Sequence, residues 1–100
     1  MANTLISGVI IENGNTLTLT EFSHAIRIKE EVVIEMVEYE VLHPEGKNPQ
    51  EWRFGSLSLT KGKKAASFYR DLDINMTGIS MILELLERIE ELEGNLKIRR

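Results

Sequence analysis

The chain has 100 residues, of which 42% are hydrophobic and 28% charged, with a formal net charge of −4 and no cysteine. This length allows one domain with a single modest core, and the composition is that of a globular protein rather than a disordered chain. The acidic balance disfavours a general binder of nucleic acid or anionic membranes, and the lack of cysteine excludes disulfides, thiolate metal sites and a cysteine nucleophile.

The first residues predict no targeting segment. The opening stretch MANTLISGVIIENGN lacks the basic region and the unbroken apolar run of a signal peptide. No part of the chain approaches the roughly 18 consecutive apolar residues of a membrane-spanning helix. We therefore expect a cytoplasmic protein without a membrane partner.

A short strand or hairpin should open the chain. Residues 5–11 (LISGVII) are rich in β-branched side chains, and the dipeptide NG that follows at 13–14 is a hairpin turn signal. Residues 16–20 (TLTLT) then alternate with a period of two. We expect this element to lie beside a second short strand around Trp52, in one small sheet.

Two helices should follow this strand. Thr20 is a suitable N-cap for the segment EFSHAIRI, which has apolar residues on one side. A second helix should begin near Lys29 and keep apolar residues at helical spacing as far as Val41. Pro44 should end it, because the residue before a proline is pushed out of the helical region.

A loop and a short strand should come next. Residues 43–51 (HPEGKNPQE) contain both prolines and a glycine, which is typical of a loop. In the following EWRF, a strand would place Trp52 and Phe54 on the same face.

A third helix should begin at a cap provided by Ser56 or Ser58 and reach about Leu72. Gly62 weakens this prediction, because a glycine inside a helix costs roughly 1 kcal/mol relative to alanine.

The last element should be an amphipathic helix from about Thr77 to Leu96. Its apolar residues recur at spacings of three and four, which is typical of a coiled-coil stripe. The stripe comprises Ile82, Leu85, Leu86, Ile89, Leu92 and Leu96. Such a stripe either packs back onto the first helices or pairs with a second copy. It exceeds what one small domain easily covers, so we favour a homodimer.

Together these elements predict a mainly α fold with a small β element, arranged as a winged helix-turn-helix followed by a long amphipathic C-terminal helix. We expect a single domain over residues 1–100. Its expected parts are an N-terminal strand or hairpin (5–20), a helix-turn-helix with its wing (20–55), the C-terminal helices (56–96) and a tail (97–100).

Six segments of the chain resemble a known family in their order and spacing. They are TLTEF at 18–22, IKEE at 28–31, VLHP at 41–44, W-x-F at 52–54, RDLDI at 70–74 and GISMILELLERIEEL from Gly78. Over roughly residues 18–92 the chain is similar to the chaperone-modulator CbpM family, a branch of the MerR-like winged helices. It departs from the family in a longer hairpin signal at its start and in Met76, where an aromatic residue is usual.

The resemblance implies a small cytoplasmic protein that binds the J-domain of a DnaJ-like co-chaperone, CbpA. By occupying the J-domain it would restrain the activity of the co-chaperone toward the Hsp70 DnaK. The family resembles DNA-binding MerR regulators in fold but works through protein contact.

The distribution of charge agrees with such a partner. A J-domain presents a basic helix and loop to the Hsp70, so its inhibitor should offer carboxylates, which steer encounter and fix register. Candidate binding residues are Glu84, Glu87, Arg88 and Glu91 on the last helix and Glu30, Glu31 and Glu35 on the second. The competing interpretation is a solvated surface on each helix, and acids in a first helical turn also favour the helix dipole.

The basic residues support a rival hypothesis, a MerR-like transcriptional regulator that binds DNA. Candidates for phosphate contact are Lys61, Lys63, Lys64 and Arg70 near the third helix, and Lys47 and Arg53 on the wing. However, DNA recognition needs Arg, Lys, Asn or Gln on the second helix, where this chain carries five glutamates between residues 30 and 40. These would repel phosphate, so DNA is disfavoured. A third hypothesis is an orphan dimerisation module.

No residue pattern predicts catalysis, a metal site or a cofactor. His24 and His43 lie in different elements and have no HxxxH or HxH partner. Asp71 and Asp73 are too close in sequence for a spaced acid/base pair, and the glycines lack the pattern of a phosphate-binding loop. We expect a non-enzymatic protein without a cofactor.

Overall fold

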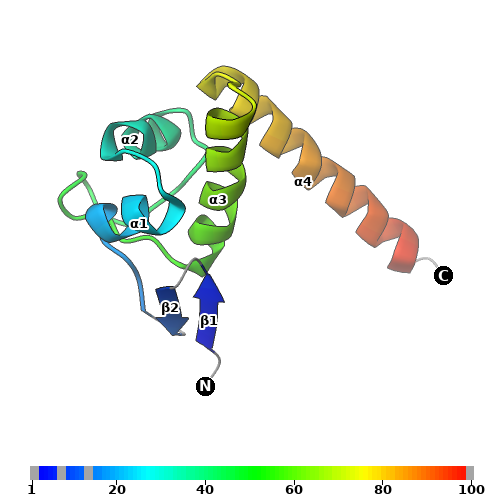
Figure 1. The fold of residues 1–100 in the computed structure, drawn as a ribbon. Helices are drawn as coiled ribbons and strands as arrows, with labels where there is room; N and C mark the ends of the chain where they lie inside the picture. Colours follow the sequence, from blue (N-terminus) through cyan, green and yellow to red (C-terminus); the bar gives the residue numbers. More distant parts are fainter. Residues whose placement is uncertain (1–2, 7–8, 13–14, 99–100) are drawn as a thin grey trace.

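The fold is mainly helical, as predicted. The computed structural model describes residues 3–6, 9–12 and 15–98, with side chains described from 15 to 94. In this part the chain forms two strands and four helices (Figure 1). These are β1 (Asn3–Ile6), β2 (Val9–Glu12), α1 (Leu19–Ile26), α2 (Glu30–Glu38), α3 (Ser56–Asp71) and α4 (Met76–Ile98).

The N-terminal element is a hairpin that begins two residues before the predicted β-rich segment 5–11 and ends one residue after it. β1 and β2 pair antiparallel, with Asn3 opposite Glu12 and Ile6 opposite Val9. Of the two predicted forms, a short strand or a hairpin, the structure has the hairpin, and its arms precede the turn signal at 13–14. The predicted turn at 13–14 lies outside the described residues.

The first helix begins earlier than predicted. Thr18, not Thr20, is the N-cap: its hydroxyl accepts from the Glu21 N–H at 3.2 Å, and the Thr18 N–H donates to the Glu21 carboxylate at 2.9 Å. This capping box satisfies two backbone donors at the helix start, so residues 18–20 do not continue a strand. Of the predicted strand residues 16–20, Leu17 alone pairs as in a sheet, through an isolated bridge to Phe54.

Removing this cap should be measurable. Thr18→Ala should lower the free energy of unfolding by about 1 kcal/mol, because it leaves a helix-end N–H without its acceptor. Thr20→Ala is the matched control, since Thr20 donates one exposed hydrogen bond to Glu30. Urea unfolding followed by circular dichroism compares the two variants. A larger loss in Thr20→Ala would contradict the assignment of the cap.

The second helix ends earlier than predicted. It stops at Glu38, and Glu40 then adopts the left-handed conformation with φ of 61°. The Val41 N–H donates back to the Met36 carbonyl at 2.8 Å, which closes the helix end and turns Val41 and Leu42 into the core. The apolar spacing allows a helix that ends before Val41 or one that includes it. The left-handed turn at Glu40 decides that the helix ends before Val41.

The predicted strand around Trp52 is reduced to isolated bridges. Glu45 pairs with Arg53, and Phe54 pairs with Leu17. The described sheet contains β1 and β2 alone, so the expected sheet between the opening element and the Trp52 segment is reduced to the single bridge between Leu17 and Phe54. Trp52 and Phe54 do share a face, as predicted, with ring centroids 6.1 Å apart in an edge-on arrangement.

The core lies between α1, α2, α3 and the start of α4. Phe22 and Phe54 are fully buried at its centre, with stacked rings 4.2 Å apart. The other large, fully buried side chains are Met36, Leu42, Leu59, Ile79 and Val33.

The third helix is capped by Gly55, not by Ser56 or Ser58, and begins at Ser56. Gly62 is buried where α3 crosses α1, and a Cβ at this position would lie 2.7 Å from Cζ of Phe22. The glycine therefore lets the two helices approach closely, which offsets its low helix propensity.

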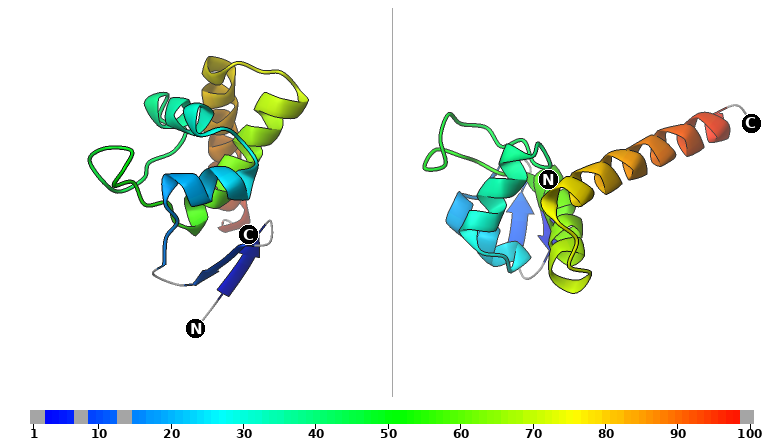
Figure 2. Two further views of the ribbon diagram at one scale, coloured as in Figure 1. Left: turned by 60° about the vertical axis from the view of Figure 1, so that its left-hand side comes forward. Right: turned by 90° about the horizontal axis from the view of Figure 1, so that it is seen from above.

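The last helix leaves the core after about two turns. Met76, Ile79 and Leu83 are its buried residues, and the rest of α4 projects away from the other helices (Figures 1 and 2). It is helical through Ile98 and so includes part of the predicted tail. The alternative in which the apolar stripe packs back onto the first helices is wrong for Leu85, because that side chain is 59% exposed. The same holds for Leu86, Ile89 and Leu92.

Candidate partner-binding surface

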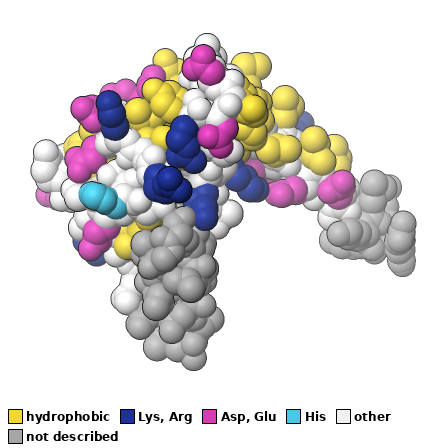
Figure 3. Space-filling view, in the orientation of Figure 1, with side chains coloured by type: hydrophobic (Ala, Val, Ile, Leu, Met, Phe, Trp, Pro, Cys, Tyr) yellow, Lys and Arg dark blue, Asp and Glu magenta, His cyan; other side chains and the backbone are white. Residues whose placement is uncertain are grey.

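The acidic face of α4 is the most distinct charged surface among the predicted site residues. Glu84, Glu87 and Glu91 are all exposed. Spacings of three and four residues place them on one side of the helix. In Figure 3, acidic side chains follow the lower edge of α4 and hydrophobic side chains its upper edge. We call the surface formed by these three glutamates the α4 acidic face.

A hollow of about 380 Å³ lies beside this face. Glu84, Glu87, Ser80 and Leu83 form its α4 side, Lys61 lines it from α3, and Tyr39, Glu40, Val41 and His43 line it from the end of α2 and the following loop. The Ser80 hydroxyl donates to the Tyr39 carbonyl at 3.3 Å and so ties α4 to the end of α2. Glu91 lies farther along α4.

One cation of the predicted basic cluster belongs to this hollow. Lys61 Nζ lies 2.8 Å from a carboxylate oxygen of Glu87, and the two side chains are 26% and 52% exposed. A partly exposed pair of this kind contributes at most about 1 kcal/mol. The pair orients Glu87 toward α3 and leaves Glu84 and Glu91 without an ion pair among the described side chains.

The hollow also contains residues that sequence reasoning missed. Tyr39, Glu40 and His43 lie some forty residues before Glu84 in the chain, and no motif or spacing links the two segments. The left-handed turn at Glu40 brings them together. No signal in the sequence alone would have found this association.

The acidic residues of α2 occupy a different surface. Glu30 and Glu31 line a shallow hollow of about 700 Å³ together with His24, Arg27 and Lys29. Glu30 accepts a hydrogen bond from the Thr20 hydroxyl at 2.9 Å, which connects α1 to the start of α2. Glu35 is half-buried. The structure therefore separates the two predicted acidic faces and places Arg27 and Lys29 in the same hollow as Glu30 and Glu31.

Comparison with known proteins identifies the family. A family model described as MerR HTH family regulatory protein matches residues 17–100. The chaperone modulatory protein CbpM of Coxiella burnetii is 46% identical over 97 residues, which cover 97% of this chain and 92% of the relative. The chain belongs to the CbpM family. A protein of the same name from Pseudomonas putida is 31% identical over 67 residues, which cover 67% of this chain and 66% of the relative. Another from Pseudomonas entomophila is 34% identical over 62 residues, which cover 62% of this chain and 61% of the relative.

The family assignment confirms the resemblance stated from the six segments. It also bears on Met76, the position at which this CbpM-family chain has methionine in place of the expected aromatic residue. Met76 is 3% exposed and begins α4 within the core. The flexible thioether side chain of methionine adapts to irregular space in a core.

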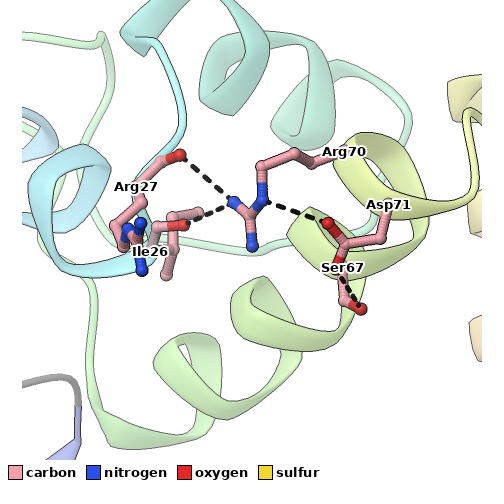
Figure 4. Close-up of polar contacts among 5 residues, drawn as sticks. All are labelled: Ile26, Arg27, Ser67, Arg70 and Asp71. Atoms are coloured by element: carbon pink, nitrogen blue, oxygen red, sulfur yellow. Dashed lines mark hydrogen bonds and ion pairs between the residues drawn. The ribbon is translucent and has the colours of Figure 1, made fainter.

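Two of the remaining basic residues are engaged within the CbpM-family chain. The Arg70 guanidinium donates to the carbonyls of Arg27, at 3.2 Å, and Ile26, at 3.5 Å, where α1 ends (Figure 4). A cation favours the negative end of the helix dipole there. Arg53 donates to the hydroxyl and carbonyl of Thr16 at 2.8 and 3.1 Å. Lys63 and Lys64 are exposed on α3.

Other kinds of site receive no support from the described residues. Among them, no group of three or more His, Asp or Glu side chains could hold a metal ion. None of the helices that the structure describes is both long enough and apolar enough to span a bilayer.

Proposed function

We propose that this chain is a non-enzymatic chaperone modulator that binds the J-domain of a DnaJ-like co-chaperone of the CbpA type and inhibits its activity with the Hsp70 DnaK. The proposal rests on the identity of 46% to a protein named chaperone modulatory protein CbpM. It places the chain in the cytoplasm with its co-chaperone.

We infer that the α4 acidic face is the principal contact with the J-domain. The single observation that carries this inference is the hollow in which Glu84 and Glu87 lie together, beside a tyrosine and a histidine from another element. A concave surface with exposed carboxylates suits a partner with a basic helix, because opposite charges steer encounter and fix register. Arg88 lies at the margin of this face, and Glu30, Glu31 and Glu35 are a secondary contact.

The proposed architecture is a MerR-like winged helix-turn-helix in one domain. The helix-turn-helix would consist of α1 and α2, with Arg27 at φ of 60° in the turn. The wing would be the loop from His43 to Phe54, joined to the body by the bridge between Leu17 and Phe54. In this arrangement, α2 presents glutamates where a DNA reader would present basic or amide side chains.

Retention on an isolated J-domain tests the function directly. Immobilised J-domain should retain the chain at low salt and release it as the salt concentration rises, because exposed charges are screened. In an assay of DnaK ATPase activity stimulated by the intact co-chaperone, the chain should reduce this activity in proportion to the amount of chain bound. Absence of salt-sensitive retention would remove the basis of the proposal.

The alternative function is a MerR-like DNA-binding regulator that uses Lys63 and Lys64. It is favoured by the match to a family of regulatory helix-turn-helix proteins. It is disfavoured by the engagement of Lys61 with Glu87 and by the acidic α2. A gel-shift assay with random duplex DNA should show no retardation at moderate salt, and clear retardation would reverse the preference.

We also propose that the chain forms a homodimer through the part of the α4 stripe that is exposed, namely Leu85, Leu86, Ile89 and Leu92. Contiguous exposed apolar surface on a small protein marks an interaction site. The stripe is separate from the α4 acidic face, so the two proposals use different surfaces of one helix.

A further inference from the structure

Two neighbouring hollows share a single ion pair between α3 and α4. One is the hollow of about 380 Å³ beside the α4 acidic face, which we call the acidic hollow. The other has about 250 Å³ and is lined by residues of α3 and α4 alone, and we call it the α3–α4 hollow. The residues that line both hollows are Lys61, Leu83 and Glu87. The contact of 2.8 Å between Lys61 and Glu87 therefore lies where the two hollows meet.

The acidic hollow favours a positive charge for two independent reasons. Three of its lining residues are glutamates, namely Glu40, Glu84 and Glu87. It also lies at the C-terminal end of α2, where the helix dipole is negative. The sequence places no basic residue in the last turn of α2 to offset that dipole. Lys61 is the one lysine or arginine among the described residues that line this hollow.

Lys61 therefore supplies a positive charge to the acidic hollow from within the chain. Its ammonium group contacts Glu87 but forms no ion pair with Glu40 or Glu84 among the described side chains. Both partners of the pair keep some contact with solvent, since their side chains are 26% and 52% exposed. Such a pair is weak, because water competes for both charges. A positive charge carried by another protein can therefore take the place of Lys61.

We propose that Lys61 is an internal competitor for Glu87, and that a lysine or arginine side chain of the J-domain displaces it on binding. Glu84 and Glu87 then hold the incoming cation together, since their spacing of three residues places them side by side on α4. The displaced Lys61 moves into the α3–α4 hollow, where Glu90 offers a second carboxylate. This inference rests on the proposed binding of a J-domain, to which it adds the regulation of the α4 acidic face.

The competition has a measurable consequence for affinity. A partner that needs Glu87 free binds less tightly by the fraction of time for which Glu87 is free. Removing the charge of Lys61 should therefore strengthen binding of the J-domain. The opposite role for Lys61 is to position Glu87 for the partner, and in that case removal of its charge would weaken binding. The direction of the change in affinity distinguishes the two roles.

Lys61→Met tests this competition, because it removes the charge and keeps an unbranched side chain. It should lower the dissociation constant for an isolated J-domain by about threefold to fivefold at low salt. Lys61→Arg keeps the charge and should stay within about twofold of the natural chain. Isothermal titration calorimetry measures the affinities, and circular dichroism checks that each variant is folded.

Lys64→Met is the matched control for the change in net charge. Lys64 lies three residues after Lys61 on α3 and lines the α3–α4 hollow but not the acidic hollow. It forms no ion pair with a described side chain. Its substitution makes the chain more acidic by the same amount and should lower the dissociation constant by less than about twofold.

Glu87→Gln removes the carboxylate for which the two cations compete. In that background Lys61→Met should strengthen binding no more than Lys64→Met does, because nothing remains to be released. Weaker binding by Lys61→Met in the natural background, or a gain equal to that of Lys64→Met, would overturn the inference and leave the J-domain proposal intact. A gain that persists with Glu87→Gln would overturn it as well. If the natural chain binds no J-domain, the proposed function fails, and this inference fails with it.

Discussion

Phe54→Ala should lower the free energy of unfolding by about 3–5 kcal/mol, the largest loss of stability expected for a single substitution in this chain. Phe54 is fully buried, stacks on Phe22 with ring centroids 4.2 Å apart, and bonds through its backbone to Leu17. Truncation removes the apolar contacts of the ring and leaves a cavity between α1 and the segment that precedes α3. Since small domains have total stabilities of about 5–15 kcal/mol, the variant should be partly unfolded at moderate temperature.

Urea unfolding followed by helical circular dichroism measures this loss. Leu57→Ala is the matched control, because Leu57 lies three residues later and is 77% exposed. Its substitution should change the free energy of unfolding by less than about 0.5 kcal/mol. Equal stabilities of the two variants would show that the segment before α3 is not anchored through Phe54.

Replacing Glu84, Glu87 and Glu91 together with lysine should slow J-domain association by about tenfold or more at low salt. The substitution reverses the charge of the α4 acidic face, so a basic partner is repelled during approach. The fold should be retained, since all three side chains are exposed and only Glu87 has an ion-pair partner. Surface plasmon resonance at two salt concentrations measures the association rate, and high salt should reduce the difference between the variant and the natural chain.

A matched triple outside the proposed contacts separates the local surface from net charge. Replacing the exposed Glu38, Glu45 and Glu51 with lysine changes the net charge of the chain by the same amount but leaves the α4 acidic face intact. This control should slow association less than the α4 triple does. If both triples slow association equally, the effect belongs to overall charge. If the α4 triple has no effect, the J-domain binds elsewhere.

Helix content was predictable because it depends on local periodicity. The apolar residues of each helical segment recur at helical spacing, so four helices were expected close to where they lie. The boundaries were less predictable, since both Thr18 and Thr20 are suitable N-caps by residue type. The reciprocal bond with Glu21 decides between them. Similarly, Val41 suits a helix by spacing, but Glu40 turns the chain before it.

The candidate site was predictable only where it lies on one element. The glutamates of α4 share a face because their spacing is helical, and the sequence alone shows this. Their surroundings come from distant segments: Lys61 from α3, and Tyr39 and His43 from the turn after α2. Such contacts depend on how the elements pack, which a single sequence does not encode in any local pattern.

By itself, the sequence determined that α4 is amphipathic, with carboxylates on one side and an apolar stripe of isoleucine and leucine on another, because the rotation per residue decides which side chains share a face. Only the tertiary structure decided which side meets the core. Ile79 and Leu83 fill the space beside α3, so α4 leaves the body at an angle that keeps Leu85, Ile89 and Leu92 exposed. The close approach of α1 and α3 at Gly62 was likewise a tertiary outcome, since it requires the absence of a side chain opposite Phe22.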